Sequence, residues 1–203
     1  MAHFLKYVHD EIITHKEKDM KNRIAVQTSG RIRDALLTLL KEEQNLGMIT
    51  IAALSDEAGI SRRTFYRYYA SKEEILTTYI ASLINEYIVE LKQSRLEKFE
   101  DLVVFFFNFW TQYADELSIL QKAGLFSLIL ETSNKMIPIL YPSVAAPWQI
   151  ASKNQRDIVY ATRYGNGGFW NVLSQWLAVD RENISVSELS SMLLNAMDSA
   201  RGK

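Results

Sequence analysis

The sequence predicts an all-α protein, and three observations support that fold class. Apolar residues recur at intervals of three and four along almost the whole chain of 203 residues, which is the period of helices that bury one face. No stretch alternates apolar and polar residues as a half-buried strand does. Three prolines and eight glycines are few enough to leave long helices uninterrupted. Because 48% of the residues are hydrophobic, the chain can also bury a sizeable core.

The first helix of the folded part is expected to run from Thr28 or Ser29 to Glu43, because Ile32, Leu36 and Leu40 share one face. Residues 1–19 precede it and have apolar residues at helical spacing, but they mix acids and bases and do not form a targeting sequence. We predict a loosely packed helix for this extension, with a frayed segment as the alternative, and assign it no function.

Residues 50–74 contain the most informative pattern, two short helices, a glycine turn and the start of a third helix. Thr50 and Ser61 are placed to cap the two short helices, and Ser71 with Glu74 forms an S-x-x-E capping box. Gly59 supplies the tight reversal between the short helices. This arrangement predicts a helix-turn-helix that binds DNA.

The second short helix, expected from Arg62 to about Tyr69, is the predicted recognition helix. Phe65 and Tyr69 lie four residues apart and form an apolar face that packs inward. A recognition helix places its N-terminal residues against base edges, and arginine suits a bidentate contact with guanine. Arg62 and Arg63 are therefore the candidates for sequence specificity. Hydroxyl and ammonium groups suit phosphate oxygens, the role predicted for Thr50, Tyr66, Tyr68 and Lys72.

The string ITIAALSDEAGISRRTFYRYYASKEEIL, residues 49–76, resembles the DNA-binding segment of the TetR/AcrR family of bacterial one-component repressors. The family pattern consists of a short helix, A-G-hydrophobic-S, T-F-Y-x-(H/Y)-(F/Y) and S-K-E. The resemblance implies that Arg62, Arg63 and Thr64 face bases. It further implies a homodimer that binds an inverted-repeat operator in double-stranded DNA and is released by a small-molecule effector.

The net charge of −1 divides unevenly along the chain. Residues 20–72 hold nine Lys and Arg against five Asp and Glu, whereas residues 73–203 hold eleven against fifteen. The positive excess thus coincides with the motif, as a DNA-binding surface requires. The alternative is a TetR-fold adapter that has lost DNA binding and regulates a partner protein. The basic and aromatic residues of the predicted recognition helix argue against that alternative.

Beyond the motif, helical spacing predicts further helices over residues 72–93, 98–116, 118–131, 152–178 and 186–199. A broken helix and loop are expected over residues 134–148, where Pro138, Pro142 and Pro147 lie. We divide the chain into an N-terminal extension (1–19), a helix-turn-helix DNA-binding domain (20–75) and a C-terminal helical bundle for dimerisation and possible effector binding (76–203).

The string GNGGFWNVLSQWL, residues 165–177, resembles the penultimate helix of many TetR-type regulators, which forms a four-helix dimer interface with the last helix. A glycine inside a helix costs about 1 kcal/mol relative to alanine, so three of them within four positions need a compensating reason. Close approach of a partner helix is one reason, and an intramolecular kink is the alternative. The predicted interface comprises Gly165, Gly168, Phe169, Val172, Trp176, Leu189 and Leu193.

The aromatic residues between positions 105 and 113 are predicted to be core residues, because an aromatic face at helical spacing excludes water from a bundle. The resemblance implies instead that this region surrounds an effector cavity, and both possibilities stay open. No charged residue lies between Val103 and Ala114, so we expect an uncharged, apolar or weakly polar effector. The candidate contacts are Phe106, Phe109, Trp110, Tyr113, Phe126, Tyr160 and Tyr164.

Nothing in the sequence supports an enzyme. The three histidines, His3, His9 and His15, all lie in the extension, and the chain has no cysteine, so neither a His/Cys metal site nor an activated nucleophile can be assembled in the body of the chain. We therefore expect no catalytic residue, metal or cofactor. No apolar run approaches the length of a membrane span, and we expect a cytoplasmic protein without a membrane partner.

Overall fold

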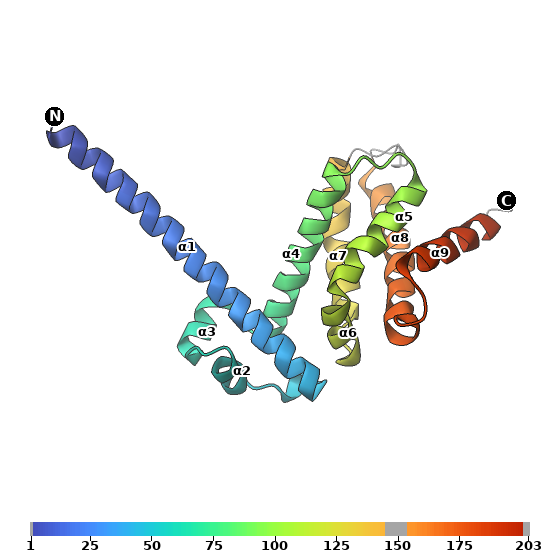
Figure 1. Ribbon diagram of the computed structural model, residues 1–203, viewed down its shortest axis with the longest axis horizontal. Helices are drawn as coiled ribbons and strands as arrows, with labels where there is room; N and C mark the ends of the chain where they lie inside the picture. The colour runs from blue at the N-terminus through green and yellow to red at the C-terminus, as the bar shows by residue number, and fades with distance from the viewer. Residues whose placement is uncertain (1, 145–153, 201–203) are drawn as a thin grey trace.

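The computed structural model describes residues 2–144 and 154–200, and side chains from residue 23 onward. Every regular element in these ranges is a helix and none is a strand, so the predicted all-α fold class is confirmed. Helices α1 to α3 form a small unit at one end, and α4 leads from it into the bundle formed by the remaining helices (Figure 1).

Helix α1 (Ala2–Glu43) is continuous, contrary to the expectation of a separate helix that begins near Thr28. The hydroxyls of Thr28 and Ser29 do not cap a helix. They donate to the carbonyls of Ile24 and Val26, at 2.8 and 2.9 Å, as hydroxyls do inside a helix. The N-terminal half of α1 projects away from the other helices (Figure 1).

The three short elements after α1 follow the predicted pattern. They are the 3₁₀ turn η1 (Leu46–Met48), α2 (Ile51–Glu57) and α3 (Arg62–Tyr68). The side chain of Thr50 accepts from the Ala53 amide, and that of Ser61 from the Thr64 amide, so both predicted caps are confirmed. Helix α2 packs against α1 and α3, which gives the unit its core.

Helix α4 (Lys72–Gln93) has the predicted bounds and is capped by Ser71, whose hydroxyl accepts from the Glu74 amide. The Glu74 carboxylate accepts from the amide of Ala70, one residue before the position expected in a capping box. Near the N-terminal unit, the Arg33 guanidinium of α1 lies 5.1 Å from the ring centroid of Tyr79. Burial, with the Glu116 carboxylate as a smaller cause, raises the pKa of Tyr79 to about 12.

Two breaks in the next part of the chain differ from the predicted ones. The elements are α5 (Phe99–Trp110), η2 (Thr111–Tyr113), α6 (Ala114–Lys122), α7 (Ser127–Leu140) and η3 (Tyr141–Ser143). The helix expected over residues 118–131 is interrupted at Gly124, whose φ of +72° few other residues adopt. Pro138 does not break its helix, because it is buried near the end of α7 and removes only one backbone hydrogen bond there.

The last two helices agree with the sequence within their described residues. Helix α8 (Gln155–Gln175) runs unbroken through its three glycines into a π-helical turn, η4 (Trp176–Asp180). Helix α9 (Val186–Ala200) begins at a capping box, in which Ser185 and Glu188 bond each other's amides. It packs against α5, and its C-terminal end points away from the bundle (Figure 1). Pro147 lies outside the described residues.

The core of the bundle is built from aromatic rings, as the sequence predicts. Tyr87 of α4 lies 5.3 Å from Phe109 and 5.9 Å from Trp110 between ring centroids. Burial raises the pKa of the Tyr87 hydroxyl, so it is neutral at physiological pH. Trp110 in turn lies 4.5 Å from Trp170 of α8, edge to face. The rings therefore join α4, α5 and α8 into one packed unit.

Candidate nucleic-acid interface and ligand cavity

Helix α3 is held to the N-terminal unit by its apolar face. Phe65 is fully buried, and its ring centroid lies 6.4 Å from that of Tyr69, which is also buried. Arg62, Arg63 and Tyr66 are exposed on the rest of the helix, with Tyr66 at 60%. Both arginines lack a hydrogen bond or an ion pair with any other described residue, so their guanidinium groups are available to a partner.

The N-terminus of α3 is organised by Ser61. Its hydroxyl accepts from the Thr64 amide at 3.0 Å and lies 2.9 Å from the Thr64 hydroxyl. Thr64, predicted to face bases, is half-buried, and its hydroxyl is engaged within the cap. Its methyl group and the hydrogen-bonding capacity of the hydroxyl that Ser61 does not use remain for contact.

The turn between α2 and α3 depends on Gly59 and on Arg31, a residue that the sequence does not single out. Gly59 has φ of +61°, and the Arg31 guanidinium donates to the carbonyls of Ala58 and Gly59 at 2.6 and 3.0 Å. A Cβ atom at position 59 would lie 2.6 Å from Nη2 of Arg31. Glycine is therefore favoured here by conformation, and a larger residue would also displace the Arg31 guanidinium.

Lys72, predicted to contact phosphate, has an internal role. Its ammonium donates to the carbonyl of Leu46 at 2.6 Å and to that of Ile49, and the side chain is half-buried. These bonds attach the start of α4 to the 3₁₀ turn η1, which leads directly into α2. The phosphate contact stays a prediction, and one of the three ammonium protons is left for it.

Lys72→Ala is expected to lower the free energy of unfolding by about 1–3 kcal/mol, because two carbonyls lose a charged donor. If Lys72 also contacts a phosphate, the slope of log K against log salt falls by about one. Urea denaturation and DNA titrations at several salt concentrations measure the two effects separately. Lys92→Ala, an exposed lysine at the other end of α4, is the control and should change neither quantity.

The remaining predicted phosphate contacts lie at the edges of the α3 surface. Thr50 is exposed, and its hydroxyl caps α2. Tyr68 is half-buried, and the Arg67 guanidinium lies 5.3 Å from its ring centroid. Arg67 is exposed and adds a third cation to the helix. The predicted DNA contacts did not include Arg67, although it lies opposite the apolar face. The described surface of α3 is thus basic and aromatic.

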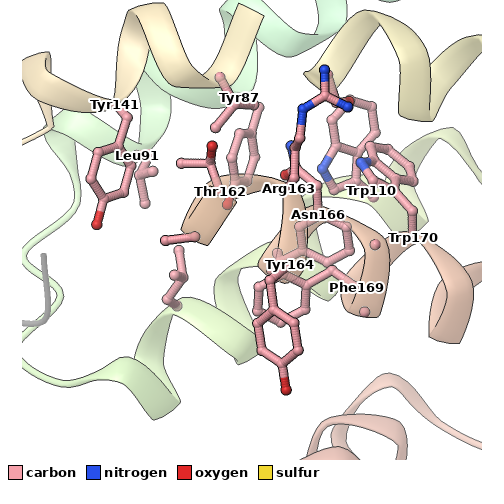
Figure 2. A pocket seen from close by; sticks show the side chains of 18 of the residues that line it. Tyr87, Leu91, Trp110, Tyr141, Thr162, Arg163, Tyr164, Asn166, Phe169 and Trp170 are labelled. Atoms are coloured by element: carbon pink, nitrogen blue, oxygen red, sulfur yellow. The ribbon is translucent and has the colours of Figure 1, made fainter. Parts of the chain in front are cut away.

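A cavity of about 920 Å³ lies in the bundle, lined by residues of α4, α5, α7, η3, α8 and α9. Its walls are mainly aromatic and aliphatic. In Figure 2, Trp110, Trp170 and Phe169 lie on one side of the view, and Leu91 and Tyr141 lie on the other. The volume is within the range of small-molecule sites, roughly 300–1,000 Å³.

Three of the predicted effector contacts line this cavity, namely Phe106, Trp110 and Tyr164. Tyr164 is 86% exposed and therefore stands at the edge of the cavity. The other four predicted contacts do not line it. Phe109 and Tyr113 face each other 5.5 Å apart beside Tyr87, Phe126 packs 6.1 Å from Trp170, and Tyr160 is 70% exposed. Burial, followed by the Glu86 carboxylate, raises the pKa of Tyr113 to about 12.

Several polar residues of the lining, such as Ser133, Thr162 and Arg163, were not predicted, because they lie on α7 and α8 rather than among the aromatic residues of α5. The Ser133 hydroxyl is buried without a hydrogen-bond partner in the described chain, as is the indole nitrogen of the predicted residue Trp110. The Thr162 hydroxyl donates to the carbonyl of Ile158 at 2.7 Å. Arg163 is exposed at the cavity. For Thr162 and Arg163, eight and seven residues before Trp170, the helical spacing along α8 was the available signal.

The residues predicted for the dimer interface fall into two groups. Gly165 is half-buried and Gly168 is exposed. A Cβ atom at either position would meet no described heavy atom within 4 Å. Phe169, Val172 and Leu193 are half-buried. Trp176 and Leu189 are instead buried within the chain, where the Trp176 indole donates to the carbonyl of Ile184 at 2.8 Å. These last two are unavailable to a partner in this arrangement.

The described residues contain no cluster of His, Cys, Asp or Glu that could hold a metal ion. Within the same residues, no helix has the length and apolar character needed to cross a membrane.

Comparisons with known proteins place the motif. Residues 35–78 match the family described as bacterial regulatory proteins, tetR family. A stretch of 76 residues is 40% identical to an uncharacterized HTH-type transcriptional regulator, YxbF, of Bacillus subtilis strain 168. That match covers 37% of this chain and only 20% of the length of YxbF.

Two solved structures share the fold over most of the chain. Lin0861 from Listeria innocua aligns with a TM-score of 0.70 at 12% identity, over 86% of this chain and 91% of that one. The fatty acid degradation regulator FadR from Bacillus halodurans aligns with a TM-score of 0.56 at 16% identity, over 82% and 94%. Identities this low are evidence of a common fold only.

Proposed function

Because residues 35–78 match the tetR family of bacterial regulatory proteins, we propose that this chain is a dimeric repressor of that family, which binds an inverted-repeat operator and is released by a small-molecule effector. The observation that carries the proposal is the exposed surface of α3, on which Arg62 and Arg63 have no partner in the described chain while Phe65 anchors the opposite face. Unpaired guanidinium groups at the N-terminal end of a recognition helix are suited to guanine in the major groove.

The dimer is supported by an exposed stripe of α8 at the edge of the cavity, which Tyr164 and Gly168 also line. Tyr160, Tyr164 and Gly168 are spaced four residues apart and so form one stripe, in which the two tyrosines are 70% and 86% exposed. Large exposed aromatic side chains beside glycine are suited to close packing against another helix. The free space at Gly165 and Gly168 also argues against intramolecular crowding as the reason for the glycines.

Effector release is supported by the position of the cavity along α4. Ile84, Tyr87 and Leu91 line the cavity, and Tyr79, five residues before Ile84 on the same helix, contacts Arg33 of the N-terminal unit. If a ligand has higher affinity for the protein with α4 in one position than in another, its binding shifts α4. That shift would change the spacing between the recognition helices of the two protomers. A tenfold loss of operator affinity needs about 1.4 kcal/mol of such coupling, and DNA must weaken ligand binding equally.

Selection of bound fragments from a random DNA pool tests the proposal. We expect an enriched inverted repeat whose half-site centres are about 34–36 Å apart, or a larger distance in phase with the DNA helix. Arg63→Ala is expected to weaken binding to that sequence by about 1–3 kcal/mol and to relax one half-site position, because a base contact is lost.

Arg95→Ala is the control, since Arg95 is an exposed arginine outside the motif and should leave specificity unchanged. A pool from which the intact protein enriches no sequence contradicts the proposal and favours the adapter that has lost DNA binding.

A further inference from the structure

We propose that the ligand of the cavity is an amphiphile with an apolar chain and one anionic headgroup, which binds at Arg163. The inference rests on the proposed function in taking this cavity as the effector site. It adds the chemical class of the effector and the residue that selects it.

The first step is the charge of the lining. Among the described residues that line the cavity, Arg163 is the only one with a formal charge, and none is Asp, Glu or Lys. An anion therefore meets no repulsive carboxylate in this wall, whereas a cation meets a like charge. We expected an uncharged effector from the residues of α5 alone, whereas the charged residue of the lining, Arg163, lies on α8.

The second step is that Arg163 is not neutralised. It forms no ion pair with another described residue, and the residues one turn away on α8, such as Val159, Tyr160, Asn166 and Gly167, include no acid. A guanidinium stays charged at any physiological pH and presents paired donors that match a carboxylate. An anionic headgroup can therefore form a bidentate contact there.

The third step is the hydrogen-bonding capacity of the rest of the lining. The indole nitrogen of Trp110 can only donate a hydrogen bond, and it is buried without an acceptor. The Ser133 hydroxyl is likewise buried without a hydrogen-bond partner in the described chain. Buried polar groups are usually paired. Together with Arg163, these groups favour a ligand that offers acceptor oxygens.

The fourth step is the apolar body of the ligand. The wall also contains aliphatic residues such as Ile88, Leu91, Ile137 and Val144, and the cavity volume is about 920 Å³. Such a wall stabilises hydrocarbon by removing it from water, by about 25 cal/mol for each Å² that is buried. Headgroup and chain are thus selected by different parts of one cavity.

Three probes with the same ten-carbon chain test the headgroup, namely decanoate, decanol and decyltrimethylammonium. Binding to the intact protein without DNA is measured by calorimetry and by the fluorescence of Trp110 and Trp170, which line the cavity. We expect decanoate to bind about tenfold more tightly than decanol, and decyltrimethylammonium to bind more weakly than decanol.

Arg163→Gln should reduce decanoate affinity to that of decanol and leave decanol affinity unchanged. The matched control is Arg156→Gln, an exposed arginine on the same helix that does not line the cavity, and it should retain the preference for decanoate. Circular dichroism checks that both variants are folded.

Equal affinity for decanoate and decanol, equal losses in the two arginine variants, or no binding of any probe would overturn the inference. The proposed function is tested independently, because operator selection uses no amphiphile. If an operator is enriched but no probe binds, only the proposed ligand class is contradicted. If a probe binds but no DNA sequence is enriched, only the proposed DNA-binding function is contradicted.

Discussion

Gly168→Leu is expected to convert the proposed dimer into a monomer and to lower operator affinity by about 10²- to 10⁴-fold, the usual gain from linking two binding modules. The leucine side chain would occupy the space on α8 where we propose that a partner helix packs, and overpacking destabilises such a contact. The recognition helix is untouched by the substitution. Light scattering at micromolar concentration and operator titration measure the two effects.

The same substitution should leave the protomer folded and slightly more stable. A Cβ atom at position 168 meets no described heavy atom within 4 Å, and leucine favours a helix over glycine by up to about 1 kcal/mol. The expected signature is therefore weaker assembly together with unchanged or higher stability of the monomer.

Gly30→Leu serves as the matched control for assembly. Gly30 lies within α1, and a Cβ atom there likewise meets nothing within 4 Å. This variant should keep the mass of the wild type. A wild type that is monomeric at micromolar concentration, or a Gly168→Leu protein that remains dimeric, contradicts the proposed interface.

Phe65→Ala is expected to lower the free energy of unfolding by about 3–5 kcal/mol, because a fully buried ring leaves a cavity in the small core of the N-terminal unit. The ring also loses its contacts with Tyr66 and Tyr69, at 5.2 and 6.4 Å between centroids. Urea denaturation followed by circular dichroism measures the loss. A change below about 1 kcal/mol would show that Phe65 does not anchor α3.

Tyr66→Ala is the comparison for Phe65→Ala, since Tyr66 is the adjacent aromatic residue but is 60% exposed. We expect its effect on stability to be within about 0.5 kcal/mol, typical of surface positions. DNA affinity should nevertheless fall if Tyr66 contacts a phosphate. The pair separates the apolar face that holds α3 from the face that is free to bind.

The parts of this protein that could be predicted from sequence depend on neighbouring residues. The hydroxyls of Thr50 and Ser61 reach an amide three residues later, whatever the rest of the chain does. The capping box of Ser185 and Glu188 is equally local. Helical periodicity is local as well, which is why the all-α class and the bounds of α4 could be predicted.

Predictions from the sequence were wrong where the effect of a residue on its helix depends on the tertiary surroundings of that residue. Pro138 was expected to break a helix, yet it is buried near the end of α7, where the lost hydrogen bond matters little. Gly124 was not expected to end one, but it adopts φ of +72° between α6 and α7. A helix was expected to begin at Thr28 or Ser29, but α1 is continuous there, and the hydroxyls of both residues bond within it.

By itself the sequence determined the helical class, the caps of α2 and α3 and which face of α3 is buried, because each depends on residues within about one helical turn. Only the tertiary structure decided that Lys72 holds the carbonyls of Leu46 and Ile49, and that Arg31 holds the turn at Gly59. These contacts join residues more than twenty positions apart. The cavity has the same cause, since its wall combines faces of α4, α5, α7, α8 and α9, and which faces meet is set by how the helices pack.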